Sequence, residues 1–345
     1  MANVTAIEDA KEAFVNVSEG IQLWYQTWGC MDGIPVLFVH GGPGNCVEDY
    51  KNVNSKFFDK DKFFVVEVDQ RGTGKSRPSV RDAVENMKLY EDVSIALMSA
   101  DFEVVREELG IERWLVFGGS WGSTLGIDYA ERFPDRCRGL IVRGIFLNTQ
   151  PEFDEVYARK SFLKNVRRLK EFDVFFELAA EEAAKRGENP LDPNDSERFI
   201  RLYESMILSG NRNAIWRFYV FENNLVEEDP DELLNPLVIA DDKRFREAQS
   251  VSFFECRLFL RGTFEEKIDL LGSRLSSLRS MHVWVVQGTG DEVCPETYAK
   301  QLVDCLAAQN IDHTAHFVDA SHKCSSDSMS VALRGCVEDF LSKGC

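Results

Sequence analysis

Short apolar runs alternate with amphipathic stretches through the first part of the chain. The runs are rich in β-branched and aromatic residues, and they cover residues 35–39, 63–68, 114–117 and 138–142. In the stretches between them, apolar residues recur at helical spacing, as in Met98, Phe102 and Val105. Buried strands that alternate with amphipathic helices predict a mostly parallel sheet with helices on both faces.

The ends of the chain add further elements to this sheet. Residues 13–18 and 21–28 alternate in polarity around Glu19-Gly20, which predicts a hairpin. The last part of the chain predicts, in order, a strand, a helix, a strand and a helix, at residues 282–286, 295–308, 313–318 and 328–342.

The pattern is different in the middle of the chain. Residues 151–275 are charged and helical in periodicity, with few strand-like runs and loop breaks such as Asp229-Pro230. The simplest interpretation is a single α/β core formed by residues 1–150 and 276–345. A helical cap domain at 151–275 interrupts this core.

A candidate nucleophile lies where the third apolar run meets a helix. Gly118-Gly119-Ser120-Trp121-Gly122 fits the pattern G-x-S-x-G. In this motif the serine occupies a strained strand-to-helix turn, and glycine avoids collisions with the neighbouring backbone. We therefore predict Ser120 as the nucleophile. The Trp121 backbone N–H, at the start of the helix, is a predicted donor to an oxyanion.

Two glycine-containing turns follow the first two runs. His40-Gly41-Gly42-Pro43-Gly44 resembles a turn that supplies the second oxyanion donor, and we assign this donor to the Gly42 N–H. His40 is expected to stabilise the turn. The segment DQRGTGKS at 69–76 lacks the spacing of a phosphate-binding loop. It is interpreted as a structural turn that braces neighbouring loops.

The general base and its acid partner are expected late in the chain, because this type of triad runs serine, acid, histidine. Of the late histidines, only His322 lies in a loop after a predicted strand, which favours it as the base. Asp291 follows the strand at 282–286 and is predicted as the acid. Glu292 and Asp319 are the competing acids.

Composition narrows the classes of function. The 40 basic and 58 acidic residues give a net charge of −18, which disfavours nucleic acid and anionic membranes as partners. The sequence shows no secretory signal, no long apolar span and no metal-ligand spacing. Nine cysteines without a CxxC pair are expected to be free thiols in a reducing compartment, so we expect a cytoplasmic protein. Because no metal-ligand spacing is present, we also expect no cofactor.

Three motifs together resemble the proline iminopeptidases, serine peptidases of the α/β-hydrolase superfamily. They are HGGPG at 40–44, DQRGTGKS at 69–76 and GGSWGSTL at 118–125. The resemblance implies the α/β-hydrolase fold with a helical cap. It also implies a substrate that is a peptide with a free N-terminus, typically proline.

The resemblance also assigns cap residues to substrate binding. Glu222 and Glu255 match glutamates that bind the terminal amine, and Phe221 matches an aromatic residue beside them. We also expect Gly41 to contact substrate. Helix geometry places both glutamates on apolar faces, where a carboxylate needs a cationic partner. An internal salt bridge is the alternative, and its candidate partners are Arg217, Arg257 and Arg261.

The resulting hypothesis is a serine aminopeptidase that acts through an acyl-enzyme and prefers N-terminal proline. Two other classes stay open at this stage. One is a carboxylesterase or lipase on the same scaffold, and the other is a non-catalytic binding protein. The sequence departs from the family pattern at three places. Phe221 before Glu222 stands where the family has tryptophan, Ser321 and Lys323 flank the base, and Cys256-Arg257 follows Glu255. The preferred first residue therefore does not follow from the sequence.

Overall fold

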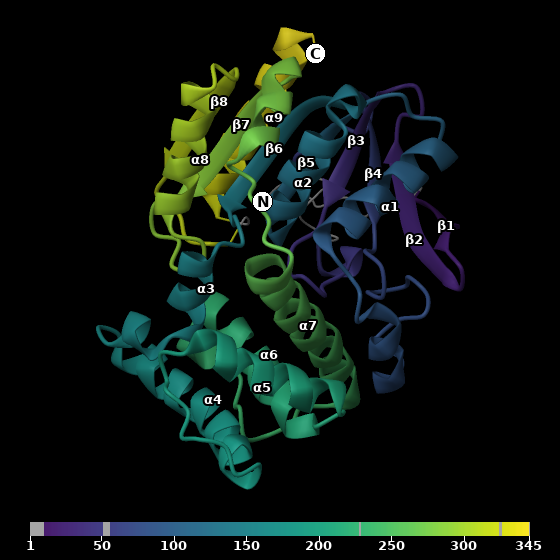
Figure 1. Cartoon of the computed structure of the whole chain (residues 1–345). Coiled ribbons are helices and arrows are strands. Elements are labelled where there is room, and N and C mark those ends of the chain that lie inside the picture. Colours follow the sequence, from purple (N-terminus) through teal and green to yellow (C-terminus); the bar gives the residue numbers. More distant parts are fainter. Residues whose placement is uncertain (1–9, 51–55, 228, 324–325, 345) are drawn as a thin grey trace. The chain divides into compact units, whose positions relative to one another are not determined.

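The computed structural model describes residues 10–50, 56–227, 229–323 and 326–344 and divides into two compact units (Figure 1). The first unit comprises Met1–Pro78, Ile95–Leu147 and Asp269–Cys345. The second comprises Ser79–Ser94 and Asn148–Ile268. The predicted cap, 151–275, overlaps most of the second unit, but it does not include the segment Ser79–Ser94.

An eight-stranded sheet forms the centre of the first unit. Its strands are β1 (Lys11–Ser18), β2 (Ile21–Gly29), β3 (Ile34–Val39), β4 (Phe63–Val68), β5 (Trp114–Ser120), β6 (Cys137–Ile145), β7 (His282–Gly288) and β8 (His313–Val318). Their order in the sheet is β1-β2-β4-β3-β5-β6-β7-β8. Strand β2 pairs antiparallel with β1 and β4, and all the other pairs are parallel. The predicted hairpin and the mostly parallel sheet are confirmed.

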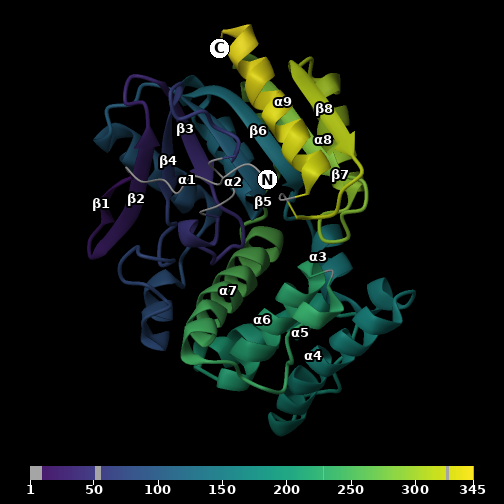
Figure 2. The same ribbon diagram turned by 180° about the vertical axis from the view of Figure 1, so that it is seen from behind.

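The helices of the first unit follow the predicted pattern closely. They are α1 (Ile95–Glu108), α2 (Trp121–Arg132), α8 (Glu296–Ala308) and α9 (Asp327–Lys343), with short helical turns at Val47–Tyr50, Pro134–Arg136 and Ser273–Ser280. A Cβ atom on Gly126 of α2 would lie within 4.0 Å of Val116, Leu140 and Val142, so α2 packs on this face of the sheet. The opposite face, which carries Phe117, Ile141 and Trp284, packs against α9, and Figure 2 shows α9 in front of the sheet. Both faces of the sheet are therefore covered, as its continuous apolar strands require.

The second unit is helical. Its helices are α3 (Gln150–Tyr157), α4 (Val166–Lys185), α5 (Ser196–Leu208), α6 (Arg212–Val226) and α7 (Asp242–Leu260), with short turns at Val84–Tyr90, Arg159–Phe162, Pro230–Glu232 and Arg261–Glu265. Polar side chains cap the longer helices. Asn165, Asp195, Asn211 and Asp241 each accept a hydrogen bond from a backbone N–H in the first turn of α4, α5, α6 and α7.

Aromatic rings form much of the core of this second unit. Phe175 stacks on Phe221 with a centroid separation of 4.3 Å and an interplanar angle of 11°. Phe199 and Tyr203 of α5 also contact Phe175, at centroid separations of 4.9 and 4.3 Å. Ring pairs of this kind add specific packing to the burial of apolar area. They join α4, α5 and α6 into one body that holds Phe221 and Glu222.

Candidate active site

The three residues predicted as a catalytic triad lie at strand ends in the first unit. Ser120 is the last residue of β5 and immediately precedes α2. Asp291 follows β7, and His322 follows β8. Strands β5 to β8 are parallel and adjacent in the sheet. Their carboxyl ends therefore share one edge, where ligand sites of open α/β sheets lie.

The turn that carries Ser120 has the geometry that its glycines predict. Ser120 has φ 56° and ψ −128°, a backbone conformation that costs a non-glycine residue free energy. A Cβ atom on Gly118 would lie 2.1 Å from the Gly122 carbonyl oxygen, and one on Gly122 would lie 2.3 Å from the Val39 carbonyl oxygen. Both flanking glycines are thus required by contact with backbone, and the turn projects Ser120 at the end of the strand.

Ser120, His322 and Asp291 form a continuous series of hydrogen bonds. His322 Nε2 lies 3.1 Å from Ser120 Oγ, and His322 Nδ1 lies 2.9 Å from Asp291 Oδ2. A carboxylate only accepts, so Nδ1–H donates to Asp291 and Nε2 is left to accept from the serine hydroxyl. Such an arrangement can deprotonate Ser120 Oγ as that oxygen attacks a carbonyl carbon.

The local environment of Asp291 keeps its carboxylate ionised. Burial by itself would raise the pKa of Asp291, but the adjacent His322 and the backbone N–H groups of Cys294 and Val293 lower it below its usual value. These N–H groups donate to Oδ1 over 2.8 and 3.0 Å. An ionised Asp291 holds the imidazole in the orientation that Ser120 requires.

Two other late histidines, His282 and His313, contact groups outside the candidate triad. His282 contacts Asp312 and Thr314 through its two ring nitrogens. His313 Nδ1 lies 2.8 Å from the Ile311 carbonyl oxygen. Both ring nitrogens of His322, in contrast, have the partners expected for a general base. Ser123, the other serine near the motif, is buried and donates to the Ser120 carbonyl oxygen.

The HGGPG turn lies against the nucleophile turn. A Cβ atom on Gly41 would lie 3.6 Å from Ser120 Cβ and 3.3 Å from the Gly119 carbonyl oxygen. Gly42 has φ 110°, a left-handed conformation that favours glycine. The Trp121 N–H belongs to the first residue of α2, where backbone donors have no intrahelical partner. The predicted oxyanion donors therefore come from two segments that flank Ser120.

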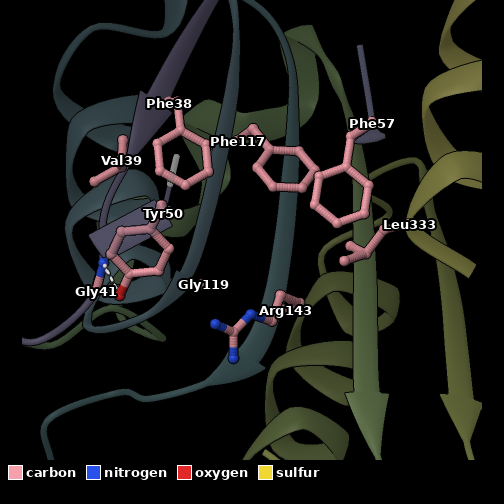
Figure 3. Close-up of a pocket in the computed structure, with 9 residues that line it drawn as sticks. All are labelled: Phe38, Val39, Gly41, Tyr50, Phe57, Phe117, Gly119, Arg143 and Leu333. Atoms are coloured by element: carbon pink, nitrogen blue, oxygen red, sulfur yellow. Dashed lines mark hydrogen bonds between the residues drawn. The ribbon is translucent and has the colours of Figure 1, made fainter. Parts of the chain in front are cut away.

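A narrow pocket borders these turns within the first unit (Figure 3). It is lined by Phe38, Val39, Gly41, Tyr50, Phe57, Phe117, Gly119, Arg143 and Leu333. Tyr50 Oη accepts a hydrogen bond from the Gly41 N–H, and Arg143 donates to the His322 carbonyl oxygen over 2.9 Å. The pocket has room for about one water molecule, so it is too small for an amino acid side chain.

The second unit carries the two predicted amine-binding carboxylates. Glu222 accepts a hydrogen bond from the Tyr157 hydroxyl. Burial raises the pKa of Glu222 to about 7, although the Tyr157 hydrogen bond acts to lower it. Glu255 is 7% exposed, and its Oε2 has no hydrogen-bond partner among the described residues. Burial, and then the charge of Glu222, raise the pKa of Glu255 well above its usual value.

The arginines considered as internal partners bind other groups. Arg217 donates to the Val174 carbonyl oxygen. Arg257 pairs with Glu204 and Glu265, and Arg261 pairs with Glu266. Within the described part of the chain, neither Glu222 nor Glu255 forms an ion pair with an arginine or a lysine. This favours an external cation over the internal salt bridge.

The structure adds Tyr157 to this site, and it shows Phe221 in the surroundings of a core residue. Tyr157, which sequence reasoning did not single out, lies at the end of α3, far along the chain from Glu222. No local pattern could have found it. Phe221 is only 3% exposed and packs in the aromatic core of the second unit. Its surroundings are therefore those of a core residue next to Glu222.

The same described residues show neither a metal site nor a membrane-spanning helix. They contain no group of three or more His, Cys, Asp and Glu side chains suited to hold a metal ion. None of their helices is both long enough and apolar enough to cross a membrane. Seven cysteines of the described residues form no disulfide bond, whereas Cys324 and Cys345 lie outside those residues.

Comparison with known proteins agrees with the fold and the motifs. The family model described as alpha/beta hydrolase fold matches residues 34–318, so the chain is an α/β hydrolase. An esterase from Exiguobacterium antarcticum superposes with a TM-score of 0.58 at 15% identity, covering 96% of this chain and 100% of that one. At this identity the likeness shows the fold alone.

Closer relatives define the family. The proline iminopeptidase of Neisseria meningitidis serogroup B is 30% identical over 332 residues, which cover 95% of each chain. A probable proline iminopeptidase of Leptolyngbya boryana is 30% identical over 347 residues, which cover 98% of this chain and 96% of the relative. The chain therefore belongs to the proline iminopeptidase family of α/β hydrolases.

Proposed function

We propose that the protein is a serine aminopeptidase that releases the N-terminal residue of a peptide, preferentially proline, through an acyl-enzyme intermediate. The observation that carries the proposal is the hydrogen-bonded series from Asp291 through His322 to Ser120. Membership of the proline iminopeptidase family supports the choice of substrate.

The proposed reaction proceeds in two halves. Ser120 Oγ attacks the carbonyl carbon of the first residue, while His322 Nε2 takes the hydroxyl proton. The N–H groups of Gly42 and Trp121 stabilise the oxyanion. His322 then gives the proton to the departing amine. In the second half, His322 accepts a proton from water as that water attacks the acyl-serine. His322 then returns the proton to Ser120 Oγ as the free amino acid leaves.

Recognition of the terminal amine is assigned to Glu222 and Glu255. Two desolvated carboxylates that influence each other's titration are unfavourable when both are ionised. A bound ammonium group offsets this repulsion and gives the buried Glu255 oxygen a partner. The need for a positively charged N-terminus would separate this protein from an esterase on the same scaffold.

The test compares three substrates: a prolyl-arylamide, its N-acetylated counterpart and a butyrate ester. We expect kcat/KM for the free amine to exceed that of the blocked substrate by roughly 100-fold, because the blocked substrate leaves the carboxylates unpaired. Glu222→Gln should lose most of this preference while cleaving the ester like the wild type.

Glu204→Gln is the matched control for this test. Glu204 is a partly buried carboxylate of the same unit that pairs with Arg257 over 2.9 Å. The variant should retain the preference for a free amine. Equal turnover of blocked and free substrates by the wild-type protein would refute the aminopeptidase assignment and favour an esterase.

A further inference from the structure

The segment DQRGTGKS at 69–76 contributes no group to the proposed reaction. It directly follows β4. In the sheet β4 lies beside β3, and β3 lies beside β5. Since β4, β3 and β5 run parallel, their carboxyl ends bring this segment next to the HGGPG turn and the nucleophile turn.

The side chain of Gln70 bridges these two turns. Its Nε2 donates to the His40 carbonyl oxygen over 3.0 Å, and its Oε1 accepts from the Trp121 indole N–H over 3.1 Å. Gln70 is 2% exposed, and His40 and Trp121 are fully buried. Hydrogen bonds in such a dry environment are stronger and less mobile than bonds in contact with water.

The backbone of Gln70 reinforces the same bridge. Its N–H donates to His40 Nε2 over 3.2 Å, so this ring nitrogen is the acceptor. His40 Nδ1, which lies 2.9 Å from the Gly41 carbonyl oxygen, must then carry the hydrogen and donate to it. Through the His40 ring, Gln70 is connected to the residue that precedes Gly42.

We propose that Gln70 is a positioning residue for the oxyanion hole. One amide fixes the separation between the turn that carries the Gly42 N–H and the helix start that carries the Trp121 N–H. The inference rests on the proposed function, because it takes these two N–H groups as the oxyanion donors. Glutamine suits the task because its terminal amide has a donor and an acceptor side by side.

The neighbouring residues of the segment serve other contacts. Asp69 accepts from the backbone N–H groups of Val47 and Lys75, both over 2.7 Å. Arg71 forms a buried ion pair with Asp101 of α1. Gln70 is therefore the member of the segment whose side chain spans both donor segments. Because donors act by pre-arranged geometry, even a small shift of one donor slows the reaction.

The experiment measures the second-order rate at which a fluorophosphonate labels Ser120. The phosphonyl oxygen occupies the oxyanion hole during labelling, so the rate reports donor geometry without requiring any particular peptide substrate. Gln70→Met keeps the length of the side chain and removes both hydrogen bonds. We expect it to label roughly 10- to 100-fold more slowly than the wild type. The kcat for prolyl-arylamide should fall in parallel, with KM within about twofold.

Thr73→Val is the matched control. Thr73 is buried and donates to the Gln70 carbonyl oxygen over 2.9 Å, so this variant disturbs the same segment without removing the bridge. It should label within about twofold of the wild type. Trp121→Phe removes the indole donor, and its effect should be less than additive with that of Gln70→Met. This single variant also tests the bridge if Gln70→Met does not fold.

The outcomes separate the two proposals. A wild type that labels at Ser120 but does not cleave prolyl-arylamide removes the aminopeptidase proposal and leaves the test of Gln70 intact. Normal labelling of Gln70→Met overturns the inference. Equal slowing of Gln70→Met and Thr73→Val also overturns it, because the segment would then have only a general structural role.

Discussion

At the scale of single residues, Glu222 determines how the protein should respond to pH. Burial places its pKa at about 7, and the hydrogen bond from Tyr157 keeps that pKa from rising further. Binding of an ammonium group requires the ionised carboxylate. A peptide N-terminus loses its own charge above a pKa of about 7.7–8.0. The ionised Glu222 and the protonated amine of the substrate therefore coexist mainly between about pH 7 and about pH 8.

We predict that kcat/KM for a free-amine substrate rises as pH increases through about 7 and falls again above about 8. Tyr157→Phe removes the hydrogen bond that lowers the pKa of Glu222, so the rising limb should move to higher pH. The measurement is a pH profile of kcat/KM. The same pH profile measured with the butyrate ester, which has no amine, shows the pH dependence without the contribution of amine binding.

Tyr203→Phe is the control for the loss of a buried phenol. Tyr203 lies in the same aromatic core, but its hydroxyl donates to the Phe175 carbonyl oxygen over 2.8 Å. The pH profile of kcat/KM for Tyr203→Phe should coincide with that of the wild type. If Tyr157→Phe left the rising limb in place, Glu222 would not be the group that controls it.

At the scale of elements, α2 has the candidate nucleophile at one end and, at the other, a buried carboxylate that forms no hydrogen bond within the described part of the chain. Its first turn follows Ser120, and Glu131 lies buried near its last turn at 4% exposed. Neither oxygen of Glu131 has a hydrogen-bond partner among the described residues, and Arg274 Nε lies 3.4 Å away. Burial, with the charges of Asp128 and Asp269, raises the pKa of Glu131 to about 8 in spite of Arg274.

This shift makes Glu131 a source of pH-dependent stability. Its pKa in the folded state lies above the value in the unfolded chain, so the folded state holds the proton more tightly. The free energy of unfolding therefore falls as pH rises from about 4.5 through about 8. Glu131→Gln should reduce the loss between pH 5 and pH 9 by up to roughly 4 kcal/mol, measured by urea unfolding.

The neighbouring Glu103 of α1 offers a control with the opposite sign. Burial would raise its pKa, but hydrogen bonds from Arg106 and Tyr129 lower it below the usual value. Its contribution is present above the unfolded pKa and is lost only at acid pH. Glu103→Gln should therefore lower stability without changing the slope between pH 5 and pH 9. An unchanged slope in Glu131→Gln would show that Glu131 is ionised in the folded protein.

At the scale of the whole molecule, local periodicity was sufficient to predict the fold class. The central strands β3 to β7 follow apolar runs of the sequence, and every strand of the first unit begins and ends within a few residues of its predicted range. Motifs at strand ends were equally informative. Parallel strands bring their carboxyl ends to one edge, so Ser120, Asp291 and His322 could be named before their distances were known.

Contacts between distant segments were not predictable in this way. Ser79–Ser94 belongs to the second unit through contacts such as the Tyr90–Phe254 ring pair, and the segment itself shows no strong periodicity. Tyr157 and Glu222 meet only because α3 and α6 pack together. The bridging side chain of Gln70 was also hidden, since a turn motif does not reveal which of its side chains spans its neighbours.

The central claim is that Ser120 carries the acyl group during turnover, and acid quenching followed by mass spectrometry tests it most directly. Within the first turnover of a prolyl ester, a prolyl adduct should appear on the peptide that contains Ser120. It should be absent from Ser120→Ala, whose kcat should fall by roughly a million-fold. Turnover without a serine-bound intermediate, together with substantial activity of Ser120→Ala, would contradict the account.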